Sequence, residues 1–375
     1  MRLRSARAAL LMGAGLFLAG CAAELGHWGH LGRAVAGHWS VMQAARPIED
    51  WLSDPATPAE LGERLHLAQQ VREFATRELA LPDNASYRRY ADLGRPAVLW
   101  NVVAAPVLSL ELKTWCYPVT GCVGYKGHFE ERRAQEEARH LREQGWEVHV
   151  YGVSAYSTLG WTNWLGGDPV LNTFARGSPI EMARLIFHEL AHQVVYVSGD
   201  MAFSEAYASA VEQLGLAHWA QHAASAAVSP AAWSAWQRRQ AQRRELMALI
   251  RVHRTALAAL YRSPLDDETR VERKRKLQGE LGQHYAQLRD ERWAGDPAFD
   301  AWVQGLNNAS LALLGSYEDW VPAFVALFER EGRQFARWHA AVKALADRPA
   351  PERRAALAAL CPSCASTQET EAGPS

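Results

Sequence analysis

The chain has 375 residues, of which 49% are hydrophobic, and 15 of them are tryptophans. This is enough apolar material for a sizeable core in one large domain or two modest ones. The formal net charge of −1 gives no reason to expect binding to nucleic acid or to an anionic membrane surface. We therefore expect no nucleic-acid partner.

The N-terminus has the pattern of an export signal. Three arginines within the first seven residues precede an apolar run from Ala8 to Ala19. This run is shorter than the roughly 20 residues that a membrane-spanning helix needs, and small residues follow it, so residues 1–20 are predicted to be a cleaved signal peptide. The string Leu-Ala-Gly-Cys that ends at Cys21 resembles a bacterial lipobox. This resemblance implies that Cys21 carries a lipid, and ordinary secretory cleavage is the alternative.

A location follows from this interpretation of the N-terminus. The mature chain is predicted to be exported and anchored by its lipid to the bacterial cell envelope, with its body in the periplasm. The membrane is then a partner only through the anchor at Cys21.

The elements change in character along the chain. Helical periodicity extends from about residue 22 to residue 92. Short β-branched and aromatic runs at about 97–127 and 146–160 predict the strands of a small sheet. A polar helix between these runs ends at Gly145, and nearly everything after Gly215 has a helical pattern.

These elements predict an α+β protein that is predominantly helical. A single domain is expected over residues 21–347, with a helical N-terminal part, the small sheet, and a helical C-terminal part. Residues 348–375, which are rich in Pro and Ala and then in Ser, Thr and Glu, are expected to form a partly disordered tail.

Four cysteines follow Cys21 in two close pairs, Cys116 with Cys122 and Cys361 with Cys364. Disulfides are the default in an exported chain because its compartment is oxidising. Four cysteines allow three connectivities, of which we favour local pairing within each pair. A zinc site with four thiolates fits the spacing of the first pair poorly, and a redox role for the second pair lacks the surrounding βαβ pattern.

The stretch IFHELAHQVVY, residues 186–196, belongs to a helix with clear end signals. Ser178 is a plausible N-cap, Pro179 takes the first helical position, and Glu181 lies three residues after the cap. Ser-Gly-Asp at residues 198–200 supplies the end of the helix.

Three ionisable residues lie inside this helix. His188 and His192 are four residues apart, so they project from nearly the same face and can share one Zn²⁺. Glu189 is rotated by roughly 100°, which suits a carboxylate that faces the water without binding the metal, as in the HExxH pattern of zinc hydrolases. An ordinary hydrogen-bonded polar cluster is the alternative.

A catalytic zinc needs a third protein ligand, and the next helix offers one. Ser204 is a plausible N-cap for this helix and Gly215 a plausible end, so the helix is expected to run back antiparallel to the first. Glu205, in its first turn, is the preferred ligand. Glu212, seven residues further on, is either a rival ligand or a carboxylate that orients a histidine.

The strings HELAHQ and FSEAYASAVE resemble the gluzincin arrangement, in which two histidines of HExxH and a glutamate from a following helix hold zinc. A wider set of blocks resembles a bacterial family described as putative aminopeptidases, many of them lipoproteins. The blocks are WCYPVTGCVGYKGHF (115–129), AYSTLGW (155–161), DPVLNTF (168–174), HELAHQ (188–193), FSEAYASAVE (203–212) and LNNASLALLGSYEDWVPAF (306–324).

The resemblance implies a zincin-like helix pair and a zinc metallopeptidase that holds one Zn²⁺. Its ligands would be His188, His192 and Glu205, and Glu189 would be the general base and acid in peptide hydrolysis. No string resembles the G-x-M-E-N signature with which a well-known gluzincin aminopeptidase family binds the free amine of its substrate. The resemblance therefore supports "peptidase" better than "amino", and an endopeptidase is one alternative. A non-catalytic, zinc-stabilised envelope lipoprotein that binds peptides or proteins is the other.

Peptide hydrolysis also needs a group that stabilises the developing oxyanion besides the metal. Tyr156, Tyr207 and Tyr317 are candidates because each lies in one of the quoted blocks. Tyr317 is placed first among them.

Overall fold

The computed structural model describes residues 36–117, 121–155, 158, 166–222, 228–314, 320–362 and 364. These residues are mostly helical and carry three small sheets, which confirms the predominantly helical α+β class. The helices are α2 (Ile48–Ser53), α3 (Ala59–Arg77), α4 (Glu131–Glu143), α5 (Asn172–Ala175), α6 (Pro179–Val194), α7 (Met201–Trp219), α8 (Pro230–Tyr261), α9 (Asp267–Arg292), α10 (Asp300–Gln304), α11 (Asn308–Leu314), α12 (Val321–Arg330), α13 (Phe335–Ala346) and α14 (Ala350–Leu360). The strands are β1 (Arg46–Pro47), β2 (Arg89–Ala91), β3 (Leu99–Pro106), β4 (Trp115–Tyr117), β5 (Gly121–Val123), β6 (Lys126–His128), β7 (Trp146–Val153) and β8 (Val170–Leu171).

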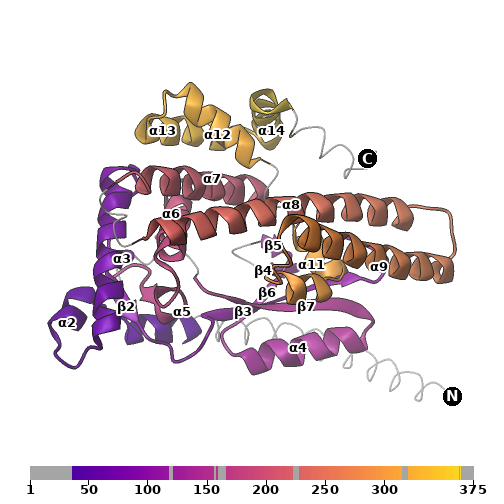
Figure 1. The fold of residues 1–375 in the computed structure, drawn as a ribbon, viewed down its shortest axis with the longest axis horizontal. Helices are drawn as coiled ribbons and strands as arrows, with labels where there is room; N and C mark the ends of the chain where they lie inside the picture. Colours follow the sequence, from indigo (N-terminus) through magenta and orange to yellow (C-terminus); the bar gives the residue numbers. More distant parts are fainter. Residues whose placement is uncertain are drawn as a thin grey trace, which may run out of the picture.

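The central sheet has the order β6-β3-β7, and all its pairings are antiparallel. Helix α4 covers one face and α11 the other (Figure 1). Strand β3 is almost wholly apolar because both of its faces are buried: Trp100 and Val102 pack with α4, whereas Val103 and Ala105 pack with α11. All three strands of this sheet come from the two predicted strand regions.

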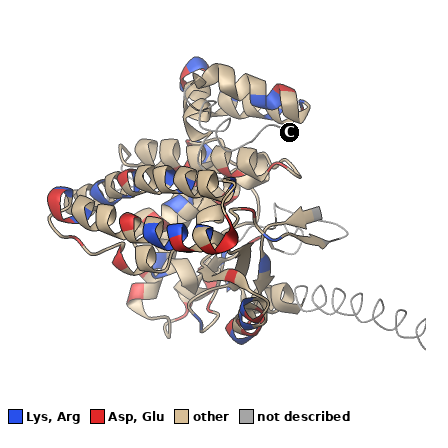
Figure 2. Cartoon of the chain, turned by 90° about the vertical axis from the view of Figure 1, so that its right-hand side faces the viewer, with Lys and Arg blue, Asp and Glu red and all other residues tan. Residues whose placement is uncertain are grey.

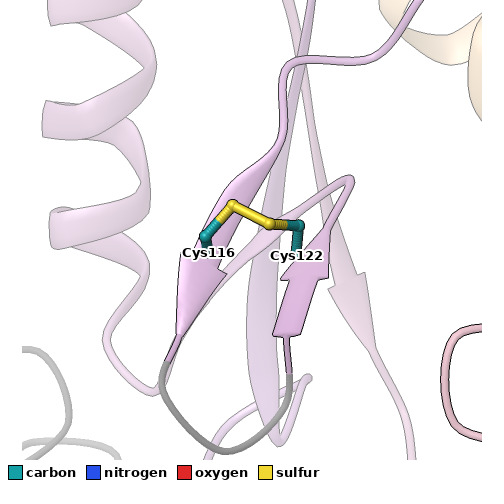
Figure 3. Close-up of a disulfide and its surroundings, with 2 residues drawn as sticks. All are labelled: Cys116 and Cys122. Atoms are coloured by element: carbon teal, nitrogen blue, oxygen red, sulfur yellow. A yellow bond between two sulfur atoms is a disulfide. The ribbon is translucent and has the colours of Figure 1, made fainter.

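The remaining strands do not join the central sheet. Strands β1, β2 and β8 form a second small sheet, and β4 and β5 form a separate hairpin. Figure 3 shows the Cys116–Cys122 disulfide, which links the two strands of this hairpin across a directly paired position. Cys361 is bonded to Cys364. Both are the local pairs that the spacing favoured.

The largest core lies among α3, α6, α7, α12 and α13. Helix α7 packs between α6 on one side and α12 on the other (Figure 1). Helix α6 therefore has one face in this core, with Ile186, Phe187 and Leu190 fully buried. The candidate site lies between α6 and α7, where the two histidines of α6 meet Glu205 of α7.

Helices α8 and α9 form a long hairpin with an apolar cluster of its own. Helix α11 braces the central sheet: the side-chain amide of Asn308 donates to the carbonyls of Pro106 and Val107, at 2.9 and 2.8 Å. Acidic and basic residues are interspersed along the helices on the side that Figure 2 shows. In the part of the chain that the structure describes, no helix is long and apolar enough to cross a membrane.

The expected tail after residue 347 is wrong in its first part, because residues 350–360 form α14. Leu357 packs in the main core, and the helix also takes part in a buried ion pair that composition does not reveal. Arg353, which is 5% exposed, donates from Nε and Nη2 to Asp200 Oδ2, at 2.9 and 2.7 Å. This contact ties α14 to the residue that caps α7.

Candidate metal centre

Helix α6 begins where the sequence predicts. The Ser178 hydroxyl accepts a hydrogen bond of 3.1 Å from the backbone N–H of Glu181, and Pro179 occupies the first helical position. His188 and His192 lie in the second half of the helix. Glu189 and His192 are buried, and the His188 side chain is 16% exposed.

Helix α7 is longer than predicted at both ends. Its N-cap is Asp200, whose carboxylate accepts from the Phe203 N–H at 3.1 Å, whereas the expected cap, Ser204, lies inside the first turn. The helix also continues through Gly215, the expected end. A Cβ atom at Gly215 would lie 2.8 Å from Leu79 and 3.1 Å from Phe187, so this glycine permits close packing of helices rather than termination.

The two helices run antiparallel, as predicted. Glu205 in α7 lies opposite His188 in α6, and Glu212, two turns later, lies opposite Arg184, one turn earlier. This pairing places both carboxylates of α7 along the histidine face of α6.

The atoms of His188, His192 and Glu205 converge on one point. The two Nε2 atoms are 3.2 Å apart, and the Glu205 oxygens lie 3.4 Å from His188 Nε2 and 3.6 Å from His192 Nε2. Tetrahedral zinc with ligands at about 2.0–2.1 Å requires ligand atoms about 3.3 Å apart. The donor set and its spacing therefore fit Zn²⁺.

Glu212 lies on the opposite side of the His188 ring. Its Oε2 is 3.4 Å from His188 Nδ1 and accepts from Arg184 Nη1 at 3.0 Å. Burial would raise the pKa of Glu212, but His188 and Arg184 outweigh burial and lower it. Because the contact is to Nδ1, Glu212 suits the role of an orienting carboxylate better than that of a third ligand.

Burial perturbs the proton equilibria of the whole group. It raises the pKa of Glu189 to about 7, with the negative charges of Glu205 and Asp168 adding to the effect and His188 opposing it. Burial and the neighbouring His188 lower the pKa of His192 to about 4, so this imidazole is neutral and its lone pair is ready for a metal.

The pKa of His188, in contrast, is raised. Burial alone would lower its pKa, but the carboxylates of Glu205, Glu212 and Glu189 outweigh burial and raise the pKa to about 10. Three carboxylates around one imidazole thus strongly stabilise a positive charge at this position. In the metal-free protein this charge is the proton on His188, and a divalent cation would be stabilised more strongly.

Two tyrosines near Glu205 were not singled out from the sequence. The pKa values of Tyr151 and Tyr196 are raised by burial and then by the charge of Glu205. Tyr151 lies on the α11 face of the central sheet, where its hydroxyl accepts from the Asn101 amide at 3.1 Å. The signal in the sequence was Asn101, the one polar residue in the strand LWNVVAAP.

Of the three tyrosines predicted from the sequence as oxyanion donors, the structure describes only Tyr207. Tyr207 is fully buried, and its hydroxyl is 2.8 Å from His339 Nδ1 in the core, so its candidacy as an oxyanion donor is wrong. Tyr156, Tyr317 and the predicted lipidation residue Cys21 lie outside the described residues.

The chain was compared with curated proteins and with solved structures, and neither comparison gives a match. A family model described as "Putative aminopeptidase" matches residues 29–357, which include α6, α7 and both candidate carboxylates. This match agrees with the family resemblance seen in the sequence blocks and supports peptide hydrolysis in general. The chain therefore belongs to the putative aminopeptidase family.

Proposed function

We propose that this protein is a zinc-dependent aminopeptidase, which removes N-terminal residues from peptides in the bacterial cell envelope. The observation that carries the proposal is the convergence of His188 Nε2, His192 Nε2 and the Glu205 carboxylate, beside the buried Glu189. One oxygen of Glu205 lies 3.4 Å from His188 Nε2 and the other lies 3.6 Å from His192 Nε2. A peptide is the substrate, and one Zn²⁺ is the catalytic cofactor.

His188, His192 and Glu205 would hold the metal. When bound, Zn²⁺ supplies a Lewis acid that lowers the pKa of water and polarises a carbonyl. The three ligands come from two helices that are packed in the main core, so the site is held by rigid elements.

Glu189 moves the proton. A group that must first accept a proton from water and then deliver it to the leaving amine works best with a pKa near the operating pH. Burial gives the Glu189 carboxyl a pKa of about 7. A closed structural site has no use for such a carboxylate, which favours catalysis over a purely stabilising role.

Arg184 and Glu212 position His188. Glu212 faces His188 Nδ1 at 3.4 Å and is itself held by Arg184, which also donates to Glu181 Oε2 at 2.8 Å. This chain of charges fixes the ring so that Nε2 points at the metal position. Tyr317 remains the predicted oxyanion-stabilising residue.

The proposed location rests on the N-terminal sequence. Residues 1–20 have the pattern of a signal peptide, and Cys21 would carry the lipid that tethers the body in the periplasm. Two disulfides suit an oxidising compartment.

A digest of a mixed peptide library, analysed by mass spectrometry, tests the proposal. The mature chain from residue 22 is incubated with zinc beside two isosteric variants, Glu189→Gln and Glu143→Gln. Glu143 is an exposed residue of α4 and serves as the matched control. We expect stepwise loss of N-terminal residues with the wild type and Glu143→Gln but not with Glu189→Gln.

The other outcomes are equally informative. Internal cuts that depend on Glu189 would keep the zinc chemistry and replace the aminopeptidase with an endopeptidase. No cleavage by a folded, zinc-loaded wild type would overturn the proposed enzyme and leave a protein that only binds peptides.

A further inference from the structure

Among the described residues, a second group of ligand-type side chains lies apart from His188 and His192. It consists of Glu78, which caps the C-terminus of α3, His218 in the last turn of α7, and His222 just beyond that helix. We name these three residues the Glu78 cluster. One ligand atom from each lies within 4.8 Å of the other two, at a corner of the molecule where α3 and α7 meet (Figure 1).

The geometry of the cluster centres on one carboxylate oxygen. Glu78 Oε2 lies 3.6 Å from His218 Nε2 and 3.6 Å from His222 Nε2. These separations are close to the roughly 3.3 Å expected between tetrahedral ligands of zinc. The ring centroids of the two histidines are 4.5 Å apart, so both rings lie on the same side of the chain.

The proton on His222 is fixed by the backbone. His222 Nδ1 is 3.1 Å from the carbonyl oxygen of His218, and a carbonyl only accepts, so Nδ1 must donate. In the neutral ring the lone pair of Nε2 then faces the Glu78 carboxylate. A lone pair and a carboxylate oxygen repel each other unless a cation lies between them, and this cation is either a proton or a metal ion.

Aromatic packing holds the rings in place. The Phe74 ring lies 5.6 Å from the His218 ring and 5.2 Å from the His222 ring, and Phe335 lies 5.9 Å from His218 on another side. The three ligand side chains are between 36% and 41% exposed, so an ion has a path from solvent. The cluster is thus restrained and accessible, as a metal site requires.

We propose that the Glu78 cluster binds a second Zn²⁺, with the fourth position open to solvent. Two imidazoles and one carboxylate suit a divalent transition metal of this kind. The ion would join the end of α3 to the end of α7, the helix that carries Glu205 and Glu212. This proposal does not depend on the proposed peptidase function.

Zinc counting by equilibrium dialysis and elemental mass spectrometry tests the proposal on the full mature chain. Three proteins are compared: the wild type, the double variant His218→Ala/His222→Ala, and the double variant His188→Ala/His192→Ala. We expect two zinc ions in the wild type and one in each double variant. Glu78→Gln, a change on a partly exposed side chain, should weaken one of the two sites and leave peptidase activity unchanged.

The design separates this site from the catalytic one. If the catalytic site fails to bind zinc, one ion should still be present in the wild type and in His188→Ala/His192→Ala but absent from His218→Ala/His222→Ala. Added Zn²⁺ should also raise the Tm of His188→Ala/His192→Ala. An unchanged zinc count in a folded His218→Ala/His222→Ala protein, together with an unchanged count in Glu78→Gln, would overturn the proposal. The cluster would then only join the ends of α3 and α7 through contacts between its own side chains.

Discussion

A buried histidine of α13 makes the stability of the fold depend on pH. His339 Nε2 donates to the Leu79 carbonyl at 2.8 Å, so its Nδ1 must accept the hydrogen bond of 2.8 Å from the Tyr207 hydroxyl. The ring is 4% exposed. Burial lowers its pKa from 6.5 to about 4; the charge of Lys343 adds to this effect, and the Leu79 hydrogen bond opposes it.

The magnitude follows from this difference in pKa. At this position the unfolded chain takes up a proton near pH 6.5, whereas the folded protein does so only near pH 4. The contribution of His339 to the free energy of unfolding is therefore fully present above pH 6.5 and is lost as the pH falls toward 4. Each unit of pKa difference corresponds to about 1.4 kcal/mol. His339 should therefore remove about 3 kcal/mol from the free energy of unfolding between pH 7 and pH 4.

Urea denaturation of metal-free protein at several pH values measures this contribution. The wild type is compared with His339→Gln, which has no titrating group at this position, so the other groups cancel in the difference. We expect the stability of the wild type to fall by about 3 kcal/mol more than that of the variant. Tyr207→Phe should keep the steep dependence because burial, the largest cause, is retained. Equal pH dependence in the wild type and His339→Gln would refute the reasoning.

Three further predictions concern the candidate site and its helices. Glu212→Gln should weaken zinc binding by about 10–100-fold in a competition titration, because His188 loses its orienting charge; an unchanged affinity would remove Glu212 from that role. The kcat/KM should fall on the acidic side of its pH profile, since Glu189 must be ionised to accept a proton. The pKa of Glu189 is about 7 without a metal, and a bound cation would move the acidic limb of the profile to lower pH. A pH profile with no acidic limb would argue against Glu189. Gly215→Val should lower the free energy of unfolding by about 2–3 kcal/mol in urea melts, because the valine side chain would be forced against Leu79 and Phe187. An unchanged free energy of unfolding would mean that α6 and α7 move apart easily.

Local signals predicted the helix that carries His188 and His192 because its cap, its proline and its apolar face lie within one stretch of sequence. The same signals misplaced the ends of α7. Ser204 and Gly215 have the right residue types for a cap and an end, yet each is used for a tertiary purpose: Ser204 accepts from the Val197 N–H at 3.0 Å, and Gly215 admits Phe187. Residue type alone does not separate these uses.

Contacts between distant segments were the least predictable part. Nothing near Glu212 in the sequence indicates that Arg184 holds it, and nothing near residue 353 indicates the buried ion pair between α14 and Asp200. Tyr151 was missed for the same reason, since its position beside Glu205 depends on how the central sheet meets α7. Such pairings depend on the packing of whole elements, to which each residue contributes little local signal.

Helix α7, which carries Glu205, is fixed along its length. Its start is bound to α14 through Asp200 and Arg353, its middle to α13 through Tyr207 and His339, and its end faces Glu78. Each contact joins α7 to a different element, so the helix cannot shift along its axis without breaking two buried polar interactions, each of which is costly to leave unmade. The positions of the proposed ligand atoms are therefore set by the fold without a metal, which is the condition for the proposed site to work without rearrangement.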